Sequence, residues 1–374
     1  MRKAGYEVIL RAHFLKNIKP LNHTSDIKGV RMQKFFLTFI IACFTVLFIT
    51  EGEAQTKDNE LRIVFTVNEN DAVPEGIAYD PVEKNFYVSS TYKRKIIKID
   101  ASGKASNFTQ EAQDGFYGVV GMRVDAKRRL LWAAHGNVGF GMPMKNLDTT
   151  HIGFSGINKY DLTTGKLVKA YLLNKPDEQY FLNDLTLDNN GRVYATDTRT
   201  QAIYTIDPKK DELELFLQLP DGHFPNGIDI TPDNKYLFLT MYADPKPVFG
   251  RIDIAAKKFQ PIDLPAQWQS GSDGLYYYNN SLIAILPEEN STDTIAQYIL
   301  DASMLKVVDA KMLVSGNPLL SQASTGVIVG NQMYFVATSN LQLFRRKYEE
   351  TQGNVNLRDL PPVRIGVVTL YPNR

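Results

Sequence analysis

Four residues whose side chains carry metal-binding oxygens occupy one repeated position in this 374-residue chain. Glu75, Asn183, Asn226 and Asp273 each open a short, alternating apolar phrase: EGIAYD, NDLTLD, NGIDIT and DGLYYY. Two carboxylates and two amide carbonyls suit a hard divalent cation, and Ca²⁺ best, because calcium coordination is flexible and water can complete it. Another divalent cation is also possible. Asn-Gly and Asp-Gly pairs are ordinarily turn formers, so the shared register of the four residues is what favours a ligand set.

The repeat that carries these residues predicts the fold. Two further segments, VGMRVD and TGVIVG, begin at Val120 and Thr325. The first residue of each of the six segments is called an opener below, and the openers follow one another at intervals of 45, 63, 43, 47 and 52 residues. Each phrase is followed by turn residues and further alternating segments, which indicates four strands per unit. Repeats of this length and content are typical of a β-propeller. We predict an all-β, six-bladed propeller with four-stranded blades; a β-sandwich with accidental similarity is the alternative.

The ends of the repeat region are expected to close the ring. Residues 61–67 and 364–370 are predicted to complete the last blade from both termini, which removes exposed sheet edges. Residues 340–345 are predicted to be the third strand of that blade. The innermost strand of each propeller blade starts at one face, so the six openers should surround one mouth of the central channel. Val120 and Thr325 would leave two sides of that mouth open to substrate.

Histidines near the predicted mouth are candidate substrate contacts. After the N-terminal leader the chain has three, His135, His151 and His223, although a lone histidine is more often structural. The long connection 136–155 is a candidate lid or substrate wall, with an ordinary surface loop as the alternative. The sequence contains no phosphate-binding glycine loop, HExxH motif or nucleophile elbow.

The first 54 residues have the form of a leader. Lys34, the apolar run 35–49 and the small residues before Gln55 predict a signal peptide that starts at Met32 and is cleaved after Ala54. The apolar run is shorter than a membrane span needs. We therefore predict residues 1–54 as upstream extension and signal peptide, and residues 55–374 as one propeller domain. The protein is expected to be secreted or periplasmic, without stable membrane association after cleavage; an uncleaved anchor is the alternative.

Composition excludes several chemistries for residues 55–374. The single cysteine, Cys43, lies in the leader, where it only loosely resembles a lipoprotein signal, so disulfides, thiol nucleophiles and zinc–thiolate sites are excluded beyond it. Residues 55–374 carry 34 Lys and Arg against 37 Asp and Glu, a formal net charge of −3. That balance gives no indication of a nucleic-acid partner.

From about Glu75 to Thr338 the chain resembles the regucalcin/gluconolactonase (senescence marker protein) family and its relatives paraoxonase and diisopropyl fluorophosphatase. The phrase that begins Asn226-Gly-Ile-Asp-Ile-Thr-Pro-Asp follows the family's wording. The resemblance implies a six-bladed propeller with calcium held in the channel by Glu75, Asn183, Asn226 and Asp273. It also implies calcium-assisted hydrolysis of a small lactone, ester or phosphotriester. Asp273 would be the catalytic residue, as general base or as nucleophile, and both roles remain open.

Two departures bear on function. Phe181 stands where gluconolactonases usually carry an arginine that holds a sugar acid, which implies a less polar substrate. The wording of residues 181–184 and 122–132 is also similar to the royal-jelly/yellow family, whose propellers are mostly regarded as binding proteins. That similarity implies the alternative of a non-enzymatic propeller that binds a small ligand and holds calcium structurally. A protein-interaction disc is a third possibility.

Overall fold

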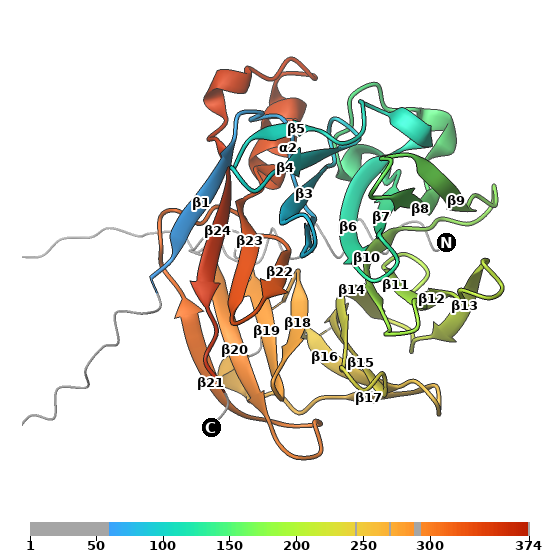
Figure 1. Cartoon of the computed structure of the whole chain (residues 1–374), viewed down its shortest axis with the longest axis vertical. Coiled ribbons are helices and arrows are strands. Elements are labelled where there is room, and N and C mark those ends of the chain that lie inside the picture. The colour runs from blue at the N-terminus through green and yellow to red at the C-terminus, as the bar shows by residue number, and fades with distance from the viewer. Residues whose placement is uncertain (1–59, 244, 269–270, 288–292, 373–374) are drawn as a thin grey trace, which may run out of the picture. The chain divides into compact units, whose positions relative to one another are not determined.

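A computed structural model describes residues 60–372, apart from residues 244, 269–270 and 288–292. The chain divides after Ala54 into two units, and all the described residues belong to the second. Six four-stranded antiparallel sheets follow one another around a ring (Figure 1). The predicted six-bladed β-propeller with four-stranded blades is confirmed.

The strands follow the repeat along the chain. Blade one contains β2 (Ile77–Asp80), β3 (Asn85–Ser90), β4 (Lys95–Ile99) and β5 (Ala105–Asn107). Blade two contains β6 (Gly118–Asp125), β7 (Leu130–Gly136), β8 (Ser155–Asp161) and β9 (Leu167–Leu173). Blade three contains β10 (Leu182–Leu187), β11 (Val193–Asp197), β12 (Ala202–Ile206) and β13 (Leu213–Gln218). Blade four contains β14 (His223–Ile230), β15 (Tyr236–Ala243), β16 (Val248–Asp253) and β17 (Lys258–Pro261). Blade five contains β18 (Leu275–Tyr278), β19 (Ser281–Leu286), β20 (Thr294–Leu300) and β21 (Val307–Val314).

The sixth blade joins the two ends of the propeller. Its strands are β22 (Gly326–Val329), β23 (Gln332–Thr338), β24 (Val363–Thr369) and, outermost, β1 (Arg62–Val67). β1 pairs antiparallel with β24, so the first and last described strands lie side by side. The predicted closure by strands from both termini is confirmed, because the last blade contains strands from both ends of the described chain.

The predicted strand at residues 340–345 is wrong. These residues belong to the helix α2 (Leu341–Glu350), and β24 takes the third position in blade six. The stretch LQLFRRKYEE is strongly amphipathic at the helical period, and its buried residue Phe344 packs on Tyr92 with ring centroids 4.5 Å apart. Alternation of apolar and polar residues over this short stretch therefore predicted a strand where the chain forms a helix. The apolar face of that helix covers the start of blade one.

Six apolar clusters fill the spaces between adjacent blades. The cluster between blades three and four, for example, joins Tyr194 and Ile203 to Ile228 and Leu237, all at most 2% exposed. Equivalent clusters occupy the other five junctions. Each blade packs against a neighbour on both faces, which is why most residues of its middle strands are buried.

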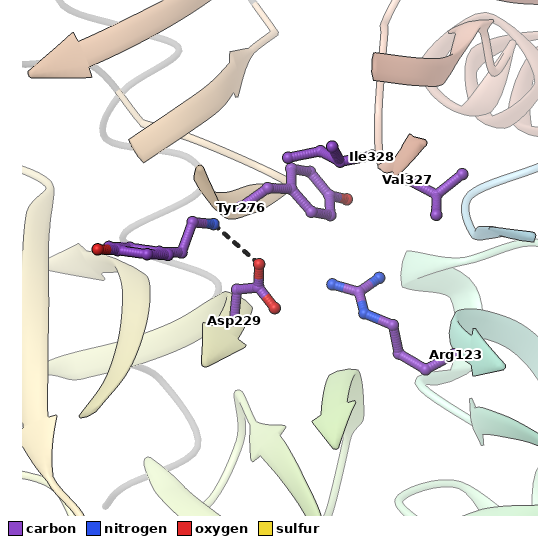
Figure 2. Close-up of a pocket in the computed structure, with 6 residues that line it drawn as sticks. Arg123, Asp229, Tyr276, Val327 and Ile328 are labelled. Carbon is purple, nitrogen blue, oxygen red and sulfur yellow. Dashed lines mark hydrogen bonds between the residues drawn. The ribbon is translucent and has the colours of Figure 1, made fainter. Parts of the chain in front are cut away.

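The innermost strands β2, β6, β10, β14, β18 and β22 surround the centre of the ring. Each residue three positions after an opener belongs to a second ring, which consists of Ala78, Arg123, Thr186, Asp229, Tyr276 and Ile328. Four of these six residues line a pocket of about 180 Å³, together with Tyr277 and Val327 (Figure 2). Because the pocket takes residues from four blades, it lies within the ring of inner strands.

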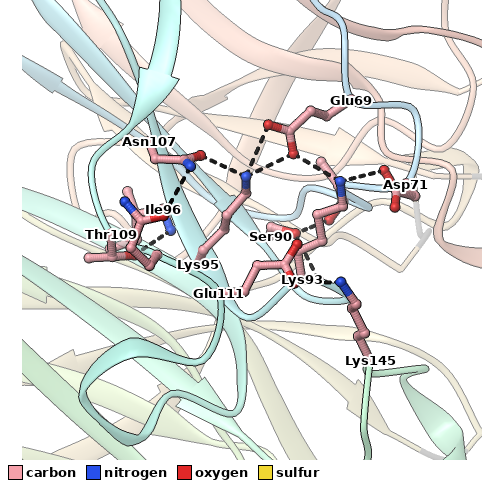
Figure 3. A network of polar contacts seen from close by, with 12 residues as sticks. Glu69, Asp71, Ser90, Lys93, Lys95, Ile96, Asn107, Thr109, Glu111 and Lys145 are labelled. Atoms are coloured by element: carbon pink, nitrogen blue, oxygen red, sulfur yellow. Dashed lines mark hydrogen bonds and ion pairs between the residues drawn. The ribbon is translucent and has the colours of Figure 1, made fainter.

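A network of lysines and carboxylates fixes the segment that leads from β1 to blade one (Figure 3). Lys95 Nζ lies 2.9 Å from Glu69 and 2.7 Å from Asn107 Oδ1, while Lys93 Nζ contacts Asp71 at 2.9 Å and Glu69 at 3.2 Å. Lys95 is only 4% exposed, so its charge requires these partners. The network anchors the chain just before Glu75.

The predicted signal peptide lies outside the described residues. Within the part of the chain that the structure describes, no helix is long and apolar enough to cross a membrane.

Candidate functional site

Three of the six openers lie in irregular positions of the inner strands, and the other three, Glu75, Asp273 and Thr325, lie just before β2, β18 and β22. In blades three and four, Asn183 and Asn226 lie in β-bulges, where two residues of the inner strand face one residue of the next strand. Val120 lies in an equivalent bulge of β6, between Val119 and Met122. A bulge bends the strand and redirects a side chain, so the repeated bulge explains why a polar residue can stand in an otherwise apolar strand.

Hydroxyl side chains satisfy the backbone at these irregular positions. Thr196 lies opposite the bulge of blade three, where its Oγ1 accepts from the Asp184 N–H at 3.1 Å and lies 2.7 Å from the Asn226 carbonyl oxygen. Thr240 does the same in blade four, between the Gly227 N–H and the Ser272 carbonyl. The threonines therefore connect each bulge to the next blade and fix the spacing of the openers.

The residue after the opener allows neighbouring blades to approach closely. A Cβ added to Gly76 would lie 2.1 Å from the Val120 carbonyl oxygen, and one added to Gly227 would lie 2.5 Å from that of Asp273. In each case the obstructing atom belongs to the opener of the next blade. Glycine is therefore required by the close contact of consecutive openers.

Direct hydrogen bonds connect only two of the four predicted ligands, and a third is connected to them through a threonine. Asn226 Nδ2 donates to Asp273 Oδ1 at 2.9 Å, which joins blades four and five. Asn183 Nδ2 donates to Thr198 Oγ1 at 3.1 Å, and Thr198 in turn donates to the Pro225 carbonyl beside Asn226. The Glu75 side chain forms no direct hydrogen bond with the other three, but burial and then the charge of Asp273 raise its pKa.

Three of the four residues keep an acceptor without a partner. Glu75 Oε2, Asn183 Oδ1 and Asn226 Oδ1 are buried and accept no hydrogen bond from the described residues. Each of these residues is 6% exposed. A buried acceptor without a donor costs about 1–3 kcal/mol, so three of them at one repeated position require an explanation. A hard cation is such an explanation, because carboxylate and amide oxygens are its preferred donors.

The charges at this end of the ring also favour a cation. Burial raises the pKa of Asp273 to about 6; the Asn226 hydrogen bond opposes the rise, and the charges of Asp184 and Asp293 add to it. Burial, followed by the charges of Asp273 and Asp184, raises the pKa of Glu75 well above its ordinary value. A bound cation would reverse both effects by stabilising the ionised carboxylates.

The donor set differs from the commonest protein metal sites. Among the described residues, no group of three or more His, Cys, Asp or Glu side chains is arranged to hold a metal ion. The ring contributes two carboxylates and two amides, and amide oxygens are ligands for calcium rather than for zinc. The residues present therefore fit calcium better than a transition metal.

The other predicted site residues lie away from these contacts. His135, on β7, is fully buried against Phe116 and Tyr117, and burial lowers its pKa to about 4, so the imidazole is neutral at pH 7. Its Nε2 has no partner among the described residues. Phe181 lies just before β10, partly buried in the cluster between blades two and three. The role of both residues in substrate binding stays a prediction.

The two remaining histidines are held by local contacts. His151 ends the short 3-10 helix η4 (Thr149–His151), with its Nδ1 2.6 Å from Asp148 Oδ2 and its ring stacked on Phe154. His223 begins β14, and its Nδ1 lies 3.2 Å from the carbonyl oxygens of Pro220 and Asp221. No described contact connects either ring with the openers, so their predicted role in substrate binding also remains untested.

Sequence reasoning missed several charged residues of the channel. Asp184 directly follows Asn183 and is 2% exposed, and Arg123 and Asp229 belong to the second ring. Burial raises the pKa of Asp184, while the nearby Arg123 charge lowers it. The sequence contains one indication of these residues, a charged residue within a predicted inner strand, as in Gly121-Met-Arg-Val. A core position in such a strand would be apolar.

These features define the class of protein as a six-bladed β-propeller with buried polar residues at the inner ends of several blades. Residues 73–244 match the family model described as SMP-30/Gluconolactonase/LRE-like region. Over this part of the chain the protein resembles the SMP-30/gluconolactonase family, as predicted. The matched region includes Glu75, Asn183 and Asn226 and ends before Asp273.

Solved structures share the fold at low identity. A gluconolactonase from Xanthomonas campestris is 13% identical, with a TM-score of 0.53 over 83% of this chain and 89% of that chain. The PQQ-bound aldose sugar dehydrogenase from Streptomyces coelicolor is 12% identical, with a TM-score of 0.55 over 83% and 98%. Virginiamycin B lyase from Staphylococcus aureus is 14% identical, with a TM-score of 0.51 over 83% and 99%. No curated protein sequence matches the chain.

Proposed function

We propose that the protein is an exported, calcium-dependent hydrolase of lactones or related esters. The observation that carries this proposal is the set of partnerless buried acceptors on Glu75, Asn183 and Asn226, beside Asp273. Similarity to the SMP-30/gluconolactonase family supports a lactonase. Export is part of the proposal because the predicted signal peptide precedes the propeller.

The four residues would have two roles, cation binding and proton transfer. Glu75, Asn183, Asn226 and Asp273 would hold the cation, which supplies polarisation of the substrate oxygen and stabilisation of the developing negative charge. Asn226 Nδ2 holds one oxygen of Asp273 at 2.9 Å and leaves the other for chemistry. As a general base, Asp273 would take a proton from water as the water oxygen attacks the carbonyl carbon. The ring C–O bond then breaks, and the leaving oxygen receives a proton.

The same carboxylate could instead attack directly. Asp273 as nucleophile would form an acyl-enzyme, which water would hydrolyse in a second step. The two routes differ in where oxygen from labelled water ends after one turnover. In the nucleophilic route, with water attacking Asp273 Cγ, the solvent label enters the Asp273 carboxylate in the first turnover and the product receives an unlabelled oxygen from Asp273. In the general-base route the label enters only the product.

The substrate would be less polar than a sugar acid. Phe181 stands where related enzymes carry an arginine, and it is partly buried against apolar residues of blades two and three. We therefore expect alkyl- or aryl-substituted lactones to react better than gluconolactone. The alternative is a non-enzymatic propeller that binds a small ligand and uses calcium structurally.

The test is a panel of lactones, aryl esters and phosphotriesters, run with chelator and then with added Ca²⁺, Mg²⁺ or Mn²⁺. We expect turnover that requires a divalent cation and falls at least about a hundredfold in Asp273→Asn. Glu350→Gln, an exposed change at the end of α2, is the matched control. Cation binding without turnover of any class would favour the binding protein, and equal turnover in Asp273→Asn would remove the mechanism.

A further inference from the structure

The second ring contains an arginine without an ionic partner. Arg123 projects from β6 into the pocket of about 180 Å³ (Figure 2). It donates long hydrogen bonds, 3.4 Å each, to the carbonyl oxygens of Met122 and Ile228, and it also interacts with the Tyr276 side chain. Among the described residues, no carboxylate oxygen lies within 4.0 Å of its nitrogens. A guanidinium has five N–H donors, so part of its donor capacity remains for a ligand.

The neighbouring carboxylates are already satisfied by other donors. Asp229 Oδ1 accepts from Thr186 Oγ1 at 3.1 Å, and its Oδ2 accepts from the Tyr277 N–H at 2.8 Å. Asp184 Oδ1 accepts from the Leu185 N–H at 2.8 Å. These carboxylates compensate the charge of Arg123 at longer range without occupying its donors. The guanidinium is therefore kept charged and free to bind an additional acceptor.

The rest of the pocket is apolar and partly open. Val327, Ile328 and Tyr277 are each half-buried, and the ring of Tyr276 lies 5.2 Å from the guanidinium carbon. A volume of about 180 Å³ is enough for a small organic molecule. Arg123 is itself half-buried, so a ligand can reach it from solvent.

We propose that this pocket binds a small organic monoanion, a carboxylate with an apolar body. Its carboxylate would accept two hydrogen bonds from Arg123, and its body would lie against Val327, Ile328 and the Tyr276 ring. Asp229 would select against dianions, because a second negative charge would face its carboxylate across the pocket. The site is separate from the openers, which lie three residues earlier along the chain in each blade, and it does not depend on hydrolase activity.

Binding of benzoate to the purified protein, measured by calorimetry, tests this proposal. Benzyl alcohol is the neutral probe of similar shape, and sulfate is the dianion probe. We expect saturable benzoate binding, with benzyl alcohol and sulfate at least about tenfold weaker. Arg123→Met should reduce benzoate affinity by a similar factor, while Arg345→Met, which removes an arginine from the surface of α2, should leave it unchanged.

A second variant keeps the test decisive if Arg123→Met fails to fold. Asp229→Asn removes a negative charge facing the site and retains an acceptor for the Tyr277 N–H, so it should tighten benzoate binding and admit sulfate. Equal affinities for benzoate and benzyl alcohol would overturn the proposal. So would benzoate binding that Asp229→Asn leaves unchanged or weakens.

Discussion

Asn226 and Asp273, 47 residues apart in the sequence, are joined across two blades by a hydrogen bond of 2.9 Å from Nδ2 to Oδ1. The bond fixes the orientation of the amide, because Nδ2 is the donor and Oδ1 must then point elsewhere. That Oδ1 is buried and accepts no bond from the described residues. One hydrogen bond thus orients both a candidate base and a candidate cation ligand.

The raised pKa of Asp273 predicts a pH dependence of stability in the absence of cations. Its folded pKa of about 6 lies above the ordinary 3.8, so ionisation destabilises the folded state. This cost is complete above about pH 7 and disappears as pH falls below about 4. From the shift we expect Asp273→Asn to be more stable than the parent protein by about 3 kcal/mol at pH 8, with the difference vanishing near pH 4. Urea unfolding in chelator across this range measures it; a constant difference would contradict the assigned cause.

Cation binding should reverse the effect of a substitution at Glu75. Burial and the charges of Asp273 and Asp184 disfavour its carboxylate when no cation is bound, so Glu75→Gln should raise the melting temperature in chelator. Saturating calcium should stabilise the parent protein more than the variant, since a ligand at a hundred times its Kd adds about 2.7 kcal/mol. Melting curves with chelator and with calcium make the comparison, with Glu350→Gln as control. The same order of stability in both conditions would argue against Glu75 as a ligand.

The sequence was sufficient to predict the blades because each unit repeats its own alternation, and the shared opener position showed which strand of each unit is innermost. It was not sufficient at α2. There the helical period of LQLFRRKYEE competed with an expected strand, and β24, from beyond the helix, completes the blade. The second ring was missed for another reason. Arg123 and Asp229 become neighbours only because bulges at the openers keep both on the channel side of their strands, and a bulge leaves little trace in sequence.

Close contact between blades predicts a marked effect at Gly227. Alanine there would place Cβ 2.5 Å from the Asp273 carbonyl oxygen, a backbone atom that cannot move without shifting the opener. We expect Gly227→Ala to lower the free energy of unfolding by about 1–3 kcal/mol and to weaken calcium binding. Gly141→Ala is the control, since its Cβ would meet only Val138 Cγ2 at 3.8 Å. Equal urea midpoints for the two variants would show that the blades adjust without cost.

The helix α2 should influence the first opener through packing. Phe344 is 1% exposed and forms a cluster with Val73 and Leu360, and Val73 lies two residues before Glu75. Phe344→Ala would leave a cavity beneath this segment and cost about 3–5 kcal/mol of stability. Calcium affinity should fall as well, because the segment that positions Glu75 loses its support. Leu357→Ala, at a side chain 43% exposed, should change neither quantity by a measurable amount. If Phe344→Ala lowers the urea midpoint but leaves calcium affinity intact, the network around Lys93 and Lys95 alone is enough to hold Glu75 in place.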